Sequence, residues 1–207
     1  RMAWCSHHAW YAAFLRAVRG ADPALAEVLH HPRLQQRPFT VSPLLGVGQA
    51  RDGQVPVRPE ETYTLRFTVL MQRIFEQFMG RFLRGERPVL RLGQTLFLIK
   101  EILATPESSP WADYVSLGAL WQAAGERAGE PLIRLEFLSP TAFSFGQRPW
   151  GRLVQPLPEA RLVFGSLART WRAFGIPGIV PEPRAVEAYA EENVAIQRLE
   201  GLETHML

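Results

Sequence analysis

Hydrophobic residues near the start of the chain recur at the spacing of an amphipathic helix. Trp10, Phe14 and Ala17 fall on one face of a helix with 3.6 residues per turn. The pattern predicts a helix over residues 7–19, and Gly20 is expected to end it.

A second helix is predicted directly afterwards, because aspartate is a good N-cap and proline fits the first helical position, as in Asp22–Pro23. The helix is expected to end at His30–His31, since Pro32 cannot continue it. Its predicted buried stripe consists of Leu25, Val28 and Leu29.

The middle of the chain alternates between the strand period and the helix period. Residues 63–69 place Tyr63, Leu65, Phe67 and Val69 on one face of a strand, whereas residues 71–83 place Ile74 and Phe75 on one face of a helix. Further strands are predicted at 39–42, 89–92 and 95–102, with a polar loop at 51–61. The order strand, helix, strand, strand predicts an α+β half of the ferredoxin-like kind.

The second half of the chain is predicted to repeat this pattern after a boundary near residue 128. We therefore expect two domains, residues 1–128 and 129–207. The expected elements are a short helix at 116–124, a strand at 132–138, a proline-containing connector at 147–158, helices at 160–174 and 183–191, and a strand at 194–202. Leu162, Leu167 and Trp171 are expected to be the buried residues of the long helix.

Composition narrows the classes of protein that fit. The net charge is +3, and Lys100 is the only lysine, so arginine carries nearly all the positive charge. Arginine suits phosphate and stacks on bases, although a coding bias toward arginine explains the same composition. Cys5 stands alone, which excludes a disulfide framework within the chain. No apolar run reaches the roughly 20 residues of a membrane span, and no secretion signal is recognised, so we expect a cytoplasmic protein.

Five histidines are the principal candidates for chemistry, and the pair His30–His31 lies where a helix is expected to end. The helix dipole favours a cationic imidazole there. With Arg33 and Arg37 just downstream, the group has a base or acid and positive charge, which RNA cleavage requires. A simple C-terminal cap is the competing interpretation. Adjacent histidines diverge by about 100° on a helix and chelate poorly, so no metal site is predicted; triphosphate-binding and dinucleotide-binding loops are also missing.

Tyr11 is a further candidate, one turn after His7 and His8 on the first helix, where it is expected to orient a phosphate or to serve as a core tyrosine. The second half carries several arginines around the connector and the long helix. They form either a phosphate-binding strip or the solvated face of that helix. The residues concerned are Arg152, Arg161, Arg169 and Arg172.

Two segments together, Asp22–His30 and Arg37–Leu44, resemble the CRISPR-associated endoribonucleases that cut precursor CRISPR RNA, members of the repeat-associated mystery protein (RAMP) superfamily. Those proteins show a leucine–histidine at the end of the second helix, then a basic residue and a Phe-Thr-x-Ser strand. Looser similarity continues in the same order through most of the chain. The further segments are Tyr63–Thr68, Leu135–Thr141, Pro156–Pro158 and Leu167–Trp171.

The resemblance implies tandem ferredoxin-like folds, an RNA-binding cleft and cleavage of CRISPR repeat RNA without metal or cofactor, leaving a 2′,3′-cyclic phosphate. It implies that His30 acts in general acid–base catalysis and that Arg37 lies near the scissile phosphate. Some members carry a tyrosine on the first helix where this chain has Leu15, and Tyr11 is expected to substitute. The residues expected to contact RNA are Arg33, Ser42, Arg152 and Arg169.

Two departures from the family pattern lead us to expect a chain truncated at both ends. No strand is predicted before the first helix, and no glycine-rich loop follows Val194, so the second fold is expected to be incomplete. Two alternatives stay open: a non-catalytic RAMP-type subunit that holds CRISPR RNA with other effector subunits, and a metabolic α+β enzyme. The second would show an enclosed apolar pocket and no salt-dependent RNA affinity.

Overall fold

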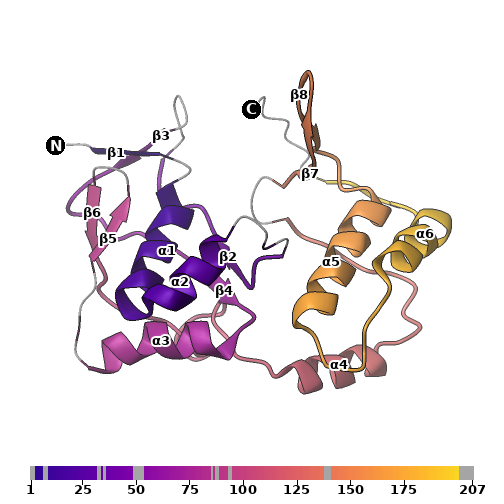
Figure 1. Cartoon of the computed structure of the whole chain (residues 1–207), viewed down its shortest axis with the longest axis horizontal. Coiled ribbons are helices and arrows are strands. Elements are labelled where there is room, and N and C mark those ends of the chain that lie inside the picture. Colours follow the sequence, from indigo (N-terminus) through magenta and orange to yellow (C-terminus); the bar gives the residue numbers. More distant parts are fainter. Residues whose placement is uncertain are drawn as a thin grey trace. The chain divides into compact units, whose positions relative to one another are not determined.

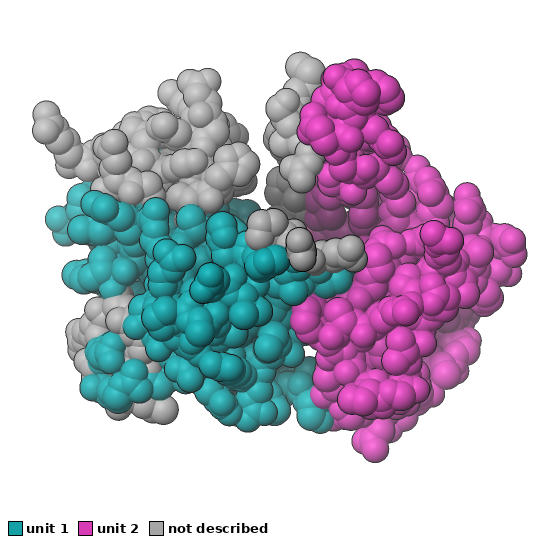
Figure 2. All heavy atoms as spheres, in the orientation of Figure 1, with its two compact units in different colours: residues 1–116 teal, residues 117–207 magenta. Residues whose placement is uncertain are grey.

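The chain forms two compact units, residues 1–116 and 117–207 (Figures 1 and 2). The structure is a computed structural model, and it describes residues 3–6, 9–31, 34, 36–48, 54–84, 86, 89–92, 95–137 and 141–200. Each unit mixes helices with antiparallel strand pairs, which confirms the predicted α+β class. The prediction of two domains divided near residue 128 stays a prediction.

In its described residues the first unit has three helices, and four of its strands pair across long stretches of sequence. Strand β1 pairs with β3 and β2 pairs with β4, while β5 and β6 form a local hairpin, all antiparallel (Figure 1). The elements in chain order are β1 (Ala3–Ser6), α1 (Ala9–Ala21), α2 (Pro23–His30), β2 (Phe39–Val41), β3 (Gln54–Val57), β4 (Phe67–Val69), α3 (Gln72–Leu83), β5 (Val89–Leu92) and β6 (Thr95–Leu98).

Strands β1 and β3 correct two sequence predictions. A strand does precede the first helix, and its partner lies inside the segment predicted to be a polar loop, with Cys5 opposite Val55 and Trp4 opposite Pro56. Both strands are short, and proline, which lacks an N–H, lowers the strand signal. Neither strand is recognisable locally because each is defined by a distant partner.

The two N-terminal helices follow the predicted pattern closely. Trp10, Phe14 and Ala17 are buried, as expected from their spacing. Helix α1 continues through Gly20 to Ala21 rather than ending at the glycine. The Asp22 carboxylate then caps α2, accepting a hydrogen bond of 2.9 Å from the Leu25 N–H.

The first unit has a core made of two clusters, and α1 contributes to both. The larger cluster packs α1 and α2 against β2 and α3, and in it Phe14 contacts the rings of Phe39 and Phe67 at centroid distances of 4.4 and 5.0 Å. The predicted inward side chains of residues 63–69 are all half-buried, although only 67–69 form β4. Two predicted core residues are instead exposed, Val28 (58%) and Phe75 (42%).

The error at Val28 has a plain physical cause. A short helix buries only the stripe that faces its neighbours, and in α2 that stripe is Leu25, Ala26 and Leu29, so Val28 lies outside it.

Strand β6 ends at Leu98, earlier than predicted. Lys100 lies beyond the strand, and its ammonium donates a hydrogen bond of 2.7 Å to the Thr62 hydroxyl.

The second unit is built on a helix pair and one β-hairpin, and α5 and α6 pack against each other. The hairpin replaces the predicted connector because the prolines flank its strands: Pro149 lies in the turn and Pro156 follows the last strand residue. Leu167, predicted buried, is exposed. The elements are α4 (Leu117–Glu126), β7 (Phe143–Arg148), β8 (Gly151–Gln155), α5 (Ala160–Phe174) and α6 (Pro183–Asn193).

Two predicted strands are wrong as far as the structure describes them. Residues 132–137 and 194–200 form neither strand nor helix, and their side chains are largely exposed, so their alternating pattern finds no partner strand. Helix α5 covers the predicted residues 160–174. None of the helices within the described residues combines the length and apolar character that crossing a bilayer requires.

Candidate functional site

His30 is the last residue of α2, and its side chain is exposed. The helix ends there because a residue that precedes proline avoids the helical region, and His31 adopts φ −58° and ψ 130°. The His31 N–H still reaches back to the Val28 carbonyl at 3.2 Å. The imidazole of His30 therefore stands at the negative end of the helix dipole, in contact with solvent.

Arg37 is fastened to the same end of α2. Its guanidinium donates a hydrogen bond to the backbone carbonyl of Leu29, the residue immediately before His30. The last carbonyls of a helix have no partner within the helix, so this bond satisfies one of them and places a fixed cation there. The bond holds the Arg37 guanidinium at the backbone of the residue before His30.

Tyr11 approaches the strand that begins just after Arg37. Its ring stacks on the Phe39 ring at a centroid distance of 5.4 Å with the planes 25° apart. The tyrosine is 37% exposed, so it lies at the edge of the core rather than within it. Phe39 itself is buried in the cluster that contains Leu29.

These contacts join the three predicted catalytic residues into one region of the first unit. Helices α1 and α2 pack against each other, and α1 also contacts β2 (Figure 1). Tyr11 stacks on Phe39, which lies two residues after Arg37 in the chain. The Arg37 guanidinium in turn donates to the carbonyl of the residue before His30. The region combines a titratable imidazole, a fixed cation and a phenol, which is a set suited to acid–base chemistry at a phosphodiester.

Ser42 has a structural role that its sequence position does not reveal. Its hydroxyl donates to the Pro43 carbonyl at 2.8 Å and accepts a bond of 2.9 Å from the Arg66 N–H, while the Ser42 N–H donates to the Arg66 carbonyl at 2.9 Å. Arg66 was not selected from sequence, because it lies on a separate segment and only the strand pairing brings it to Ser42. RNA contact by Ser42 stays a prediction.

The arginines of α5 are engaged with carboxylates, Arg161 with Glu159 among them. Arg169 pairs with Glu187 across α5 and α6, and Arg172 pairs with Glu182 at 2.7 Å. This pattern accords with the solvated-face interpretation of the helix, and RNA contact by Arg169 stays a prediction. Arg33 and the Arg152 side chain lie outside the described residues, as do His7 and His8.

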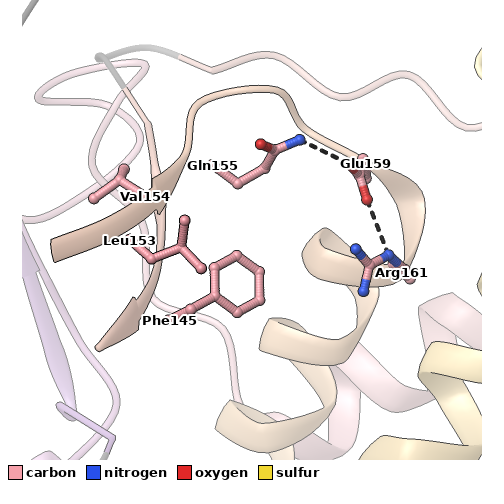
Figure 3. Close-up of a pocket in the computed structure, with 6 residues that line it drawn as sticks. All are labelled: Phe145, Leu153, Val154, Gln155, Glu159 and Arg161. Atoms are coloured by element: carbon pink, nitrogen blue, oxygen red, sulfur yellow. Dashed lines mark hydrogen bonds and ion pairs between the residues drawn. The ribbon is translucent and has the colours of Figure 1, made fainter. Parts of the chain in front are cut away.

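A hollow of about 300 Å³ opens in the second unit between the β7–β8 hairpin and the start of α5 (Figure 3). Phe145 and Leu153 line it on the hairpin side. Arg161 on its rim is bound to Glu159 at 2.9 Å, and Gln155 donates to the same carboxylate at 2.6 Å. The polar side chains on its lining are thus engaged with one another through the Glu159 carboxylate.

Within the described part of the chain, no three histidine, cysteine, aspartate or glutamate side chains are grouped to hold a metal ion.

Comparison with known proteins gives the family. The model of the CRISPR Cas6 N-terminal domain matches residues 2–122, more than half of the chain. A solved Cas6 (TTHB231) product complex is similar to the chain, with 26% sequence identity and a TM-score of 0.58, over 92% of this chain and 70% of that one. Among curated proteins, no match was found.

The fold and these matches define a CRISPR-associated protein of the RAMP superfamily with a ferredoxin-like α+β fold, as the sequence resemblance predicted. The chain belongs to the Cas6 family. The matched region contains α1, α2 and β2, and therefore all three residues of the candidate site.

Proposed function

We propose that the protein is an endoribonuclease that cleaves CRISPR repeat RNA without a metal ion and so produces mature guide RNA. Membership of the Cas6 family supports this proposal, together with an exposed histidine on a helix end that also holds an arginine. In this proposal CRISPR repeat RNA is the binding partner, and contacts with other effector subunits are a further expectation.

The proposed reaction is an internal phosphoryl transfer. The 2′-oxygen of the nucleotide before the cut attacks the phosphorus, its proton passes to a base, and the bond from phosphorus to the 5′-oxygen breaks. The leaving 5′-oxygen takes up a proton, so the products are a 2′,3′-cyclic phosphate and a 5′-hydroxyl. His30 serves as the acid or base because imidazole is the side chain that titrates near neutral pH.

Arg37 is proposed to stabilise the negative charge that builds up on the phosphorane oxygens. A guanidinium carries five N–H groups, so one bond to the Leu29 carbonyl leaves others for a phosphate oxygen. Because that bond restrains the side chain before substrate arrives, little reorganisation is needed when charge develops. Tyr11, held by its stack on Phe39, is proposed to orient the scissile phosphate or the attacking hydroxyl.

The observation that carries the proposal is the bond from Arg37 to the carbonyl next to His30. The experiment incubates purified protein with repeat RNA in EDTA and analyses both binding and product ends. Cutting to a cyclic phosphate and a 5′-hydroxyl supports the endoribonuclease. Binding without any cut product would instead favour the non-catalytic RNA-binding subunit, and no salt-dependent binding at all would reject both.

A further inference from the structure

The β2–β4 pair presents a polar face on the side opposite to the core. Thr40 and Thr68 are direct partners and their hydroxyls are hydrogen-bonded to each other. Residues two apart on a strand share a face, so Ser42 and Arg66, paired by two backbone-directed bonds, lie on the same side. Phe39 and Phe67 point the other way, into the core.

Trp111 lies beside the Arg66 end of this polar face. The guanidinium carbon of Arg66 lies 5.3 Å from the centroid of the Trp111 ring, within the range of a cation–π contact. Arg66 is itself held in place through its backbone by Ser42. One face of the indole is therefore occupied by a cation that is anchored to the sheet.

The rest of the indole is presented to solvent by an ordered turn. The Trp111 N–H donates to the Ser109 hydroxyl at 3.2 Å, and the Ala112 N–H donates to the Ser109 carbonyl at 3.0 Å. The tryptophan is 58% exposed. The neighbouring acidic group, Asp113, has one carboxylate oxygen bound by the Tyr114 N–H at 2.7 Å. An aromatic ring with an accessible face, on a turn held by backbone hydrogen bonds, is thus combined with a cation.

We propose that Trp111 stacks on an unpaired nucleobase of the RNA, with Arg66 contacting the adjacent phosphate and the hydroxyls of Thr40 and Thr68 contacting the sugar–phosphate backbone. This inference rests on the proposed function, since it adds a second contact to the same substrate. Aromatic rings beside a cationic surface are the usual means of binding single-stranded nucleic acid. Hydroxyls and one fixed cation around a single ring suit RNA better than an apolar protein partner.

The position of Trp111 relative to the candidate catalytic residues limits which base is involved. The backbone hydrogen bonds between the β2 and β4 segments run from Pro38 to Ser42. At the first end, the Pro38 carbonyl accepts a hydrogen bond of 2.7 Å from the Leu70 N–H. At about 3.3 Å per residue the span from Pro38 to Ser42 is roughly 13 Å. Arg37 lies at one end and Arg66 at the other, and the polar face is turned away from the core side on which Tyr11 stacks on Phe39, so the stacked base is expected to lie beyond the nucleotides that flank the cut.

The test measures binding of fluorescein-labelled oligo(A) RNA and of repeat RNA carrying a deoxynucleotide at the cut site. Trp111→Ala is expected to weaken both by roughly 5- to 150-fold, the range for loss of one stacked base, and Trp111→Phe by less. Trp150, 78% exposed in the β7–β8 turn, supplies the matched control. Trp150→Ala is expected to bind within about twofold of the wild type. Unchanged binding by Trp111→Ala would overturn the inference.

An abasic scan of the repeat RNA identifies the contact itself. At one position within a few nucleotides of the cut, removing the base should weaken RNA binding by the wild type but should not change RNA binding by Trp111→Ala. The reason is that both changes remove the same stack. If the two losses add at every position, Trp111 does not stack on a base and the inference fails. RNA cutting that persists alongside such a failure leaves the proposed function standing. Conversely, a Trp111-dependent stack without cutting rejects the endoribonuclease but keeps the RNA site.

Discussion

The guanidinium of Arg37 donates a hydrogen bond to the backbone carbonyl of Leu29, and the next residue along the chain is His30. This contact ties the loop after α2 to the last turn of that helix. It places a permanent cation close to an exposed imidazole. Among the contacts of Arg37 within the described residues there is no carboxylate that would neutralise this cation. An interaction between chain segments, rather than a sequence motif alone, thus defines the candidate site.

Replacing Arg37 tests whether the bond serves both stability and chemistry. Arg37→Ala is expected to lower the free energy of unfolding by about 1–3 kcal/mol, because a helix-end carbonyl loses a charged partner. It is also expected to slow single-turnover cutting by roughly 100-fold, the typical effect of removing a donor that stabilises a transition-state oxyanion. Urea unfolding and quenched-flow cutting measure the two effects. Arg58→Ala, which removes an exposed pair with Glu61, is the control and should change neither appreciably.

Arg37→Lys separates charge from geometry at the same position. Lysine keeps the charge but lacks the planar fork, so we expect cutting to be intermediate between Arg37→Ala and wild type. Cutting by Arg37→Ala at the wild-type rate, with stability lowered as expected, would assign Arg37 a purely structural role.

Tyr11 distinguishes a packing role from a chemical one through its hydroxyl. Tyr11→Phe keeps the ring that stacks on Phe39, so the thermal midpoint should stay within about 2 °C of wild type. Cutting should nevertheless fall several-fold, because the phenol is proposed to orient the phosphate. Tyr11→Leu should lose the stack on Phe39, lower the thermal midpoint and slow RNA cutting. Equal rates for Tyr11→Phe and wild type would make the tyrosine a packing residue only.

Asp22 makes the stability of α2 dependent on pH. The hydrogen bond from the Leu25 N–H and the ion pair with Arg73 hold the pKa of Asp22 below its ordinary value. Because the folded-state pKa is the lower one, the stabilisation is fully present above the unfolded value of about 3.9 and disappears as the pH falls through the folded value. Asp22→Asn keeps a capping oxygen without the charge. Its urea midpoint should therefore fall less steeply than that of wild type between about pH 5 and 2, and parallel curves would contradict the assignment.

Gly165 leaves room for the Glu187 side chain between α5 and α6. A methyl group at this position would clash with the Glu187 side chain, whereas one at Gly125 in α4 would have nothing within 4 Å. Gly165→Ala should therefore destabilise the protein through displacement of Glu187 and its partner Arg169. Gly125→Ala should stabilise it by about 0.5–1 kcal/mol, since alanine is the better helix former. Chemical unfolding of both variants compares them directly, and equal shifts would contradict the crowding at Gly165.

The helices could be predicted from sequence because their signals are local. The start of α2 follows from Asp22–Pro23, and α5 follows from its own apolar period, with no information from the rest of the fold. Strands β1 and β3 could not be predicted because each is defined by its partner, Ala3–Ser6 with Gln54–Val57. The alternating residues 132–137 show the converse error, since alternation without a partner strand gives no strand.

The site was predictable in part for the same reason. The exposure of His30 follows from a helix that must end before Pro32, a local signal. The bond from Arg37 to Leu29, the stack of Tyr11 on Phe39 and the contact of Arg66 with Trp111 depend on tertiary packing, and no spacing in the sequence specifies them. Arg169 was selected for its charge, yet Glu187 on the neighbouring helix already pairs with it.

The most direct test of the central claim compares His30→Ala with His31→Ala in single-turnover cutting of repeat RNA in EDTA. The two histidines are adjacent and both exposed, so they differ in position rather than in side-chain type or general accessibility. His30→Ala should lower the rate by roughly 100- to 10,000-fold with binding within a few-fold of wild type, while His31→Ala should cut at close to the wild-type rate. Undiminished cutting by His30→Ala would contradict the assignment of this imidazole to the reaction.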